Sequence, residues 1–135
     1  MADVTVKRID EMDSLFEGQF TRARAELGVS AFGMQVINLP ANWENYPEHA
    51  HSESFANDGQ EEVYVALEGR ATLVAGGERF ELEPGVLARV GPRQLRKIVT
   101  AGEPFRMLAI GGTPGRPYEA PPFTEVGAPP PPLPG

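Results

Sequence analysis

Short hydrophobic runs separated by glycine and proline turns make up the middle of the chain. The turn signals recur every few residues from about residue 69 onward, among them Gly76-Gly77 and Pro84-Gly85. Short runs at this spacing, with little helical periodicity, are typical of an antiparallel sandwich or barrel. The expected strands cover residues 33–39, 62–68, 70–75, 78–83, 86–90, 95–100 and 104–110.

Alternation within these runs predicts which side chains share a face. In a strand, residues i and i+2 point the same way, so Glu62, Tyr64 and Ala66 form one face of segment 62–68. In segment 78–83, Phe80 and Leu82 alternate with glutamates, which predicts one solvated face.

The two ends of the chain differ from its middle. Val4, Val6 and Ile9 show a short strand-like pattern, and a short helix is expected over 21–27, with Thr21 as its cap and Gly28 as its stop. From Thr113 onward prolines dominate, and such a run favours polyproline II over a strand.

These composition changes predict three parts. Residues 1–32 are expected to pack on the barrel, 33–112 to form it, and 113–135 to be a proline-rich extension. The extension is expected either to dangle or to strap across the barrel or a neighbouring subunit through Tyr118 and Phe123.

The candidate chemistry begins at His49 and His51, the two histidines of the chain. On an extended segment both imidazoles point the same way, and Glu62 opens the next predicted strand. An isolated His-x-His in a loop is more often a surface feature. A carboxylate at the start of a buried strand favours a site instead, with two nitrogens and one oxygen suited to Zn, Fe, Mn or Ni.

These motifs resemble those of the cupin superfamily. His-Ala-His followed by EVYVALEG is similar to the first cupin motif, and GGERFELEPGVLARVGP, with Gly85, is similar to the second. The resemblance covers roughly residues 33–112. It implies an all-β, single-domain antiparallel jelly-roll barrel of six or eight strands, with a short N-terminal helix and a proline-rich C-terminal tail.

The sequence departs from the family pattern in several places, and in the second motif the family's proline, glycine and asparagine fall on Gly91, Arg93 and Thr100. Trp43 stands where the family usually has glycine, and residues 52–61 separate the second histidine from Glu62, a longer loop than usual. The fourth family ligand, a histidine, falls on Arg96, which has no lone pair to give a metal. A register shift of two residues would place Gln94 there, and its oxygen can coordinate a metal.

The resemblance therefore implies two alternative states of the site. In the first, His49, His51 and Glu62 hold a divalent metal, Arg96 orients a small anionic ligand, and Tyr64 is a proton donor. In the second, no metal binds and Arg96 pairs with Glu62, which gives a non-enzymatic small-molecule binder. The family includes oxygenases, isomerases, decarboxylases and lyases, so the fold does not choose a reaction. No organic cofactor is implied.

Composition removes several other functions. The net charge of −7 argues against a nucleic-acid surface, and the lack of cysteine excludes disulfides and thiolate chemistry. Neither a secretory signal nor a membrane-length apolar run is present, so a cytoplasmic protein that does not bind membranes is expected.

Apolar faces of segments 33–39 and 104–110 predict a homodimer. A further alternative is an interaction module that acts through the proline tail.

Overall fold

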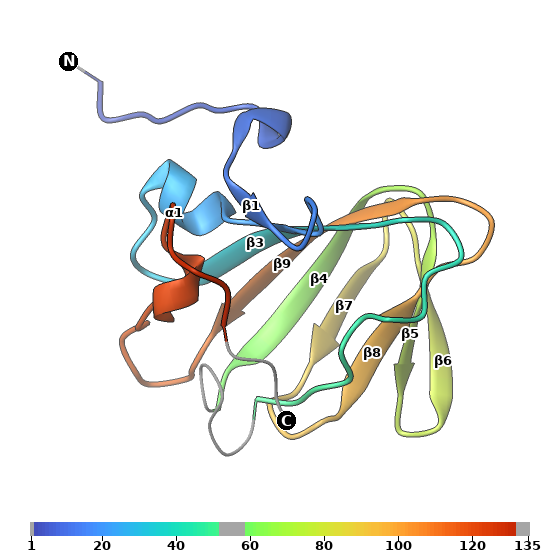
Figure 1. Cartoon of the computed structure of the whole chain (residues 1–135). Helices are drawn as coiled ribbons and strands as arrows, with labels where there is room; N and C mark the ends of the chain where they lie inside the picture. The colour runs from blue at the N-terminus through green and yellow to red at the C-terminus, as the bar shows by residue number, and fades with distance from the viewer. Residues whose placement is uncertain (1, 52–58, 132–135) are drawn as a thin grey trace.

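Two antiparallel sheets form the body of the molecule in the computed structural model, which describes residues 2–51 and 59–131 (Figure 1). The larger sheet has the order β1-β2-β3-β9-β4-β7 and the smaller one β6-β5-β8. Their strands are β1 (Ser14–Leu15), β2 (Phe20–Thr21), β3 (Gly33–Leu39), β4 (Glu61–Glu68), β5 (Ala71–Ala75), β6 (Glu78–Leu82), β7 (Leu87–Val90), β8 (Arg96–Val99) and β9 (Phe105–Gly112). The predicted all-β, antiparallel jelly-roll class is confirmed.

The core lies between the inner faces of the two sheets. On β4, Tyr64 is fully buried and Ala66 is 7% exposed, whereas Leu67 is 38% exposed, as the alternation predicted. Met107 on β9 and Ile98 on β8 are also fully buried and belong to the same cluster. All seven strands expected between residues 33 and 112 are present, with ends shifted by two residues at most.

One strand differs from the prediction of a single solvated face. Phe80 on β6 is 46% exposed, whereas Leu82 is 1% exposed. β6 is an outer strand of the three-stranded sheet, so the facing sheet does not cover Phe80 as it covers Leu82. Alternation predicts which residues share a face, but it does not predict how far the opposite sheet extends.

The N-terminal predictions were partly wrong. Residues 2–8 are not a strand, and Val4 and Val6 are 71% and 86% exposed, because no strand of the described residues pairs with them. The first 3-10 helix, η1, covers Ile9–Glu11.

The short helix, α1 (Ala23–Leu27), begins later than expected. Thr21 belongs to β2 and pairs with Val36 in the sheet, so its backbone is extended and it does not cap the helix. Gly28 ends α1 in the left-handed conformation with φ 78°, as predicted.

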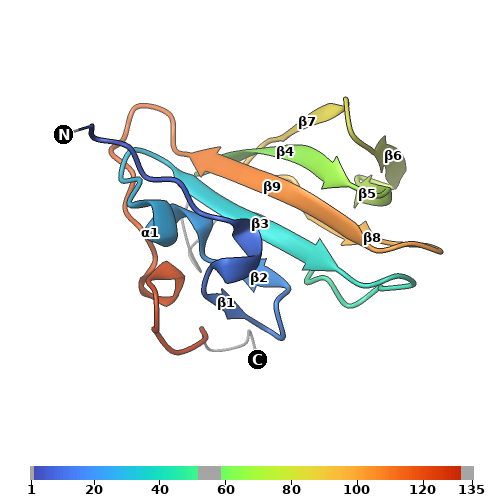
Figure 2. The same cartoon turned by 90° about the horizontal axis from the view of Figure 1, so that it is seen from above.

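The C-terminal extension packs against the N-terminal part of the same chain. It contains the second 3-10 helix, η2 (Pro122–Thr124), and the ring of Phe123 lies 5.6 Å from that of Phe20. Figures 1 and 2 show this segment beside α1 and β1, away from β5 and β6. The extension is therefore a strap over its own chain.

Two parts of the predictions lie outside the described residues. These are residues 52–58, most of the long loop between His51 and Glu62, and residues 132–135 at the end of the proline tail. No helix of the described part is long and apolar enough to cross a membrane.

Candidate metal centre

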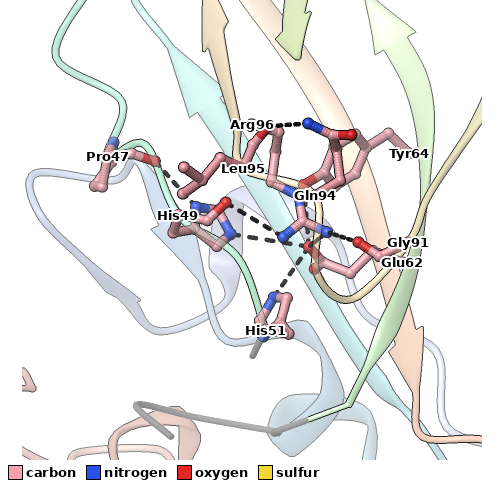
Figure 3. A network of polar contacts seen from close by, with 9 residues as sticks. All are labelled: Pro47, His49, His51, Glu62, Tyr64, Gly91, Gln94, Leu95 and Arg96. Carbon is pink, nitrogen blue, oxygen red and sulfur yellow. Dashed lines mark hydrogen bonds and ion pairs between the residues drawn. The ribbon is translucent and has the colours of Figure 1, made fainter. Parts of the chain in front are cut away.

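The two histidines lie on an extended segment that runs beside the smaller sheet. His49 forms an isolated antiparallel bridge with Arg96 of β8, with backbone N–H···O distances of 3.0 and 2.9 Å. The His51 backbone N–H donates to the Pro92 carbonyl at 2.7 Å. These bonds hold the segment straight, so both imidazoles point toward β4, as Figure 3 shows.

Glu62 meets the histidines from the larger sheet. Its Oε1 atom lies 3.1 Å from His51 Nε2 and 3.9 Å from His49 Nε2. One ligand atom from each of the three residues lies within 4.8 Å of the other two. The structure thus brings together the three residues that the sequence predicted as metal ligands.

The His49 ring is held in one orientation by its second nitrogen. Nδ1 lies 3.0 Å from the Pro47 carbonyl oxygen, which can only accept a hydrogen bond. The proton therefore belongs on Nδ1, and in a neutral ring the lone pair of Nε2 faces Glu62. Histidines that bind metals are commonly oriented by such a bond.

Arg96 and Tyr64, the two predicted catalytic residues, lie behind the carboxylate and are both fully buried. The Tyr64 hydroxyl donates to Glu62 Oε1 at 3.0 Å, and Arg96 Nη2 lies 3.6 Å from the same oxygen. Gln94 instead lies at the surface, where its amide donates to the Leu95 carbonyl. The structure thus places Arg96 beside the cluster.

The guanidinium of Arg96 is directed at the backbone. Nη1 donates to the His49 carbonyl at 3.4 Å and Nη2 to the Gly91 carbonyl at 3.2 Å (Figure 3). Its Nε–H is buried and has no hydrogen-bond partner among the described residues. Arg96 therefore links the histidine segment to the turn before β8.

The charges around Glu62 keep it ionised. Burial alone would raise the pKa of Glu62, but the contact with His51 and the positive charge of Arg96 hold it well below its usual range. Burial and the negative charge of Glu62 raise the pKa of Tyr64 above its usual range, so its hydroxyl keeps its proton at neutral pH.

Tyr46 is a neighbour of the site that the sequence analysis missed. Its ring lies 5.8 Å from that of His49, and it packs against the core from a turn-rich segment. Its hydroxyl interacts with that of Tyr64, and burial is the main cause that raises its pKa. Its position three residues before His49 was the available signal, but an aromatic residue in a turn does not by itself indicate a functional site.

The cupin domain family model matches residues 42–111, which is more than half of the chain. The chain belongs to the cupin family. This agrees with the jelly-roll topology and with the position of the His-x-His segment opposite β4.

Solved cupin structures resemble this one at low sequence identity. A cupin protein from Bacteroides fragilis is 21% identical with a TM-score of 0.66, and the match covers 89% of this chain and 92% of that one. A sugar phosphate isomerase of the cupin superfamily from Silicibacter pomeroyi is 23% identical with a TM-score of 0.57, over 68% of this chain and 57% of that one.

A third relative is a DMSP lyase from Ruegeria pomeroyi. It is 23% identical with a TM-score of 0.53, over 71% of this chain and 45% of that one. This cupin therefore spans about half the length of the two named enzymes, and at these identities the matches show the fold alone. No curated protein sequence matches the chain.

The donor set of this cupin fits a divalent metal. Two ligands that share a metal at about 2.1 Å lie about 3.0–3.4 Å apart in tetrahedral or octahedral geometry. The 3.1 and 3.9 Å separations to Glu62 Oε1 are close to this range, so small side-chain movements suffice. Arg96 adds a positive charge beside the donors, which lowers the expected affinity.

Proposed function

We propose that this cupin binds a divalent metal through His49, His51 and Glu62, and that the metal site binds a small anionic ligand. The geometry of His49 supports this most directly. Its Nδ1 is occupied by the Pro47 carbonyl, and its Nε2 lies 3.9 Å from Glu62 Oε1. That separation is too long for a hydrogen bond but is close to the spacing of two ligands on one ion.

A metal held at these residues would polarise an oxygen of the ligand or take part in oxygen chemistry. The protein residues then have separate tasks. Tyr64 remains protonated and donates its hydroxyl to Glu62 Oε1, so it holds the carboxylate in place, and a proton could leave it only by way of Glu62. An isomerase, lyase or oxygenase reaction on a small acid would use these parts, and the isomerase and lyase structures with this fold support that range.

Arg96 is proposed to act mainly through its neighbours. Its hydrogen bonds go to the carbonyls of His49 and Gly91, and its charge faces Glu62 at 3.6 Å. It therefore positions the His49 segment and keeps Glu62 ionised. Its charge also favours an anionic ligand over a neutral one at the neighbouring metal.

The metal-free binder is the second candidate, and the 3.6 Å contact between Arg96 and Glu62 favours it. Without an ion, Glu62 already receives the Tyr64 hydroxyl and lies next to His51. The carboxylate is therefore satisfied in either state. In the metal-free state the site would hold an organic acid through the two imidazoles.

Elemental analysis of the purified, untagged protein distinguishes these candidates. The protein is first incubated with Fe, Mn, Ni or Zn and then desalted, beside a His51→Ala variant. The metal proposal predicts close to one equivalent in the wild type and a loss of about ten-fold or more in occupancy in the variant. No metal in either protein would favour the metal-free binder, and equal metal content in both would reject His51 as a ligand.

A homodimer remains part of the proposal. β3 and β9 are each paired on both sides in the sheet, so only their outward faces are left for a partner. Leu108 and Ile110 on β9 are half-buried, and Leu87 on the outer strand β7 is 71% exposed. Light scattering at micromolar concentration should give the mass of two chains, and a monomer mass would remove this proposal.

A further inference from the structure

Two buried glutamines lie on the same sheet face as the metal centre. Gln60 immediately precedes β4, and Gln35 lies in the middle of β3. They are 5% and 9% exposed, and neither side-chain oxygen has a hydrogen-bond partner among the residues that the structure describes. A buried carbonyl oxygen without a donor is costly, so such groups usually have a reason to persist.

Strand register places both glutamines next to the site. Gln60 and Glu62 are two residues apart and share a face of the extended chain. Gln35 pairs with Ala109, which pairs with Tyr64 on its other side. Adjacent strands are about 4.8 Å apart, so Gln35 and Tyr64 are separated by about 10 Å, the length of a small organic molecule.

Between the glutamines, one row of the sheet consists of glycines that are covered by side chains from other segments. Gly33 of β3 pairs with Gly111 of β9, and Gly111 pairs with Glu62, so β9 and β3 carry no side chains of their own in this row. The side chain of Gln60 lies directly over Gly111, where a Cβ atom would be 2.4 Å from its amide carbon. Tyr118 lies in the same way over Gly33. Gln60 therefore extends across the sheet toward β3.

The two halves of this face differ in chemistry. At one end are the imidazoles, Glu62 and Arg96, which can hold a metal and an anion. At the other end are two neutral carboxamides, each with an unpaired acceptor oxygen. The last torsion of a glutamine side chain is soft, so a small rotation can turn either oxygen toward a ligand. These acceptors require hydrogen-bond donors on the ligand.

We propose that Gln35 and Gln60 form a second half of the ligand site, which selects small acids that carry hydroxyl groups over acids of the same charge that lack them. This rests on the proposed function, since the acidic end of the ligand would lie at the metal centre. A site with unpaired acceptors rejects an analogue that lacks the matching donors, because those acceptors then remain unpaired.

The test uses pairs of acids that differ only in hydroxyl groups. Glycerate is compared with propionate, and tartrate with succinate, by calorimetric titration of the metal-incubated protein. We expect the wild type to bind the hydroxylated member about ten-fold more tightly. Gln35→Met and Gln60→Met should each bring the ratio of the two affinities close to one, and should change the affinity for propionate less than two-fold. No preference in the wild type, or full preference in both variants, would overturn the proposal.

Thermal stability gives a second, independent readout. Methionine keeps the length of glutamine and removes the unpaired oxygen, so both variants should melt at the same temperature as the wild type or higher. If both variants melt at a clearly lower temperature, the glutamines are structural and the proposal is wrong. Gln19→Met, in the turn between β1 and β2, is the matched control, and it should leave the preference unchanged.

These outcomes are separable from failure of the metal proposal. Elemental analysis of the same samples reports whether metal is bound. A preference for glycerate that depends on Gln35 and Gln60 in a metal-free protein would support the glutamine site and reject the metal. Bound metal without any such preference would support the metal site and reject the glutamine site.

Discussion

Arg22 and Arg96, two of the three arginines that are buried among the described residues, have different surroundings. Arg22, just before α1, is 2% exposed, and Arg96 on β8 is fully buried. The guanidinium of Arg22 binds Asp13 at 2.5 Å, the Phe123 carbonyl at 2.9 Å and the Ala128 carbonyl at 2.5 Å. The contacts of Arg96 are 3.2–3.6 Å long, and its Nε–H has no partner among the described residues.

The difference indicates two kinds of site. Every nitrogen of Arg22 donates a short hydrogen bond, so Arg22 joins the N-terminal part to the C-terminal strap. We call Arg22, Asp13 and the carbonyls of Phe123 and Ala128 the clasp. Around Arg96, long contacts leave polar capacity unused next to two histidines and a carboxylate. Under-satisfied polar groups of this kind are more common at functional sites than in purely structural contacts.

The largest effect is expected from breaking the clasp. Arg22→Met leaves two strap carbonyls without their donor and Asp13 with the Gly127 amide but without its positive charge, and should lower the free energy of unfolding by about 3 kcal/mol. Chemical denaturation measures this. Arg70→Met removes an exposed pair with Glu83 and should cost less than about 1 kcal/mol. Equal losses in the two variants would contradict the clasp.

Breaking the second arginine site should cost less stability and change metal binding. Arg96→Met should lower the free energy of unfolding by about 2 kcal/mol, because Glu62 keeps its contacts with Tyr64 and His51. Removing the neighbouring positive charge should raise the affinity for Mn²⁺ or Zn²⁺ about ten-fold. Weaker metal binding in this variant would contradict this prediction and would show that the hydrogen bond from Arg96 to the His49 carbonyl outweighs its charge.

Tyr64→Phe should have a smaller effect. It removes one hydrogen bond to Glu62 and should lower the free energy of unfolding by about 1.5 kcal/mol. Metal affinity should stay the same or rise, because the hydroxyl competes for Glu62 Oε1. Tyr46→Phe, which keeps the ring beside His49, is the control and should change the metal affinity less.

The smallest effect is a pH dependence of the clasp. A hydrogen bond from the Gly127 amide, followed by the contact with Arg22, lowers the pKa of Asp13 from its ordinary 3.8. The unfolded chain therefore binds the proton more readily, so this stabilisation is present above about pH 4 and is lost as the pH falls below it. The stability difference between wild type and Asp13→Asn should be smaller at pH 3 than at pH 7, and a larger difference at pH 3 would contradict it.

The comparison also explains what the sequence could predict. His49, His51 and Glu62 followed from local spacing and the two-residue period of strands. The position of Arg96 followed from the spacing of the second cupin motif. These predictions depend on short stretches of chain whose geometry is nearly fixed once a strand forms.

The clasp could not be predicted in this way. Arg22 reads as a surface charge beside a short helix, and it is buried only because residues 101 and 106 positions later fold back over it. Val4 and Val6 read as a strand but have no pairing strand among the described residues. Gln35 likewise becomes a neighbour of the site only through pairing between distant strands.

The central claim is that Glu62, with the two histidines, binds a metal. Glu61 gives a matched control, because it is the preceding residue on the opposite face and pairs with Arg89 at 2.9 Å. Mn²⁺ is titrated into the wild type, Glu62→Gln and Glu61→Gln. One binding equivalent in the wild type and Glu61→Gln, with at least a ten-fold loss of affinity in Glu62→Gln, is the predicted result. Equal binding by all three proteins, or none by any, would contradict the claim.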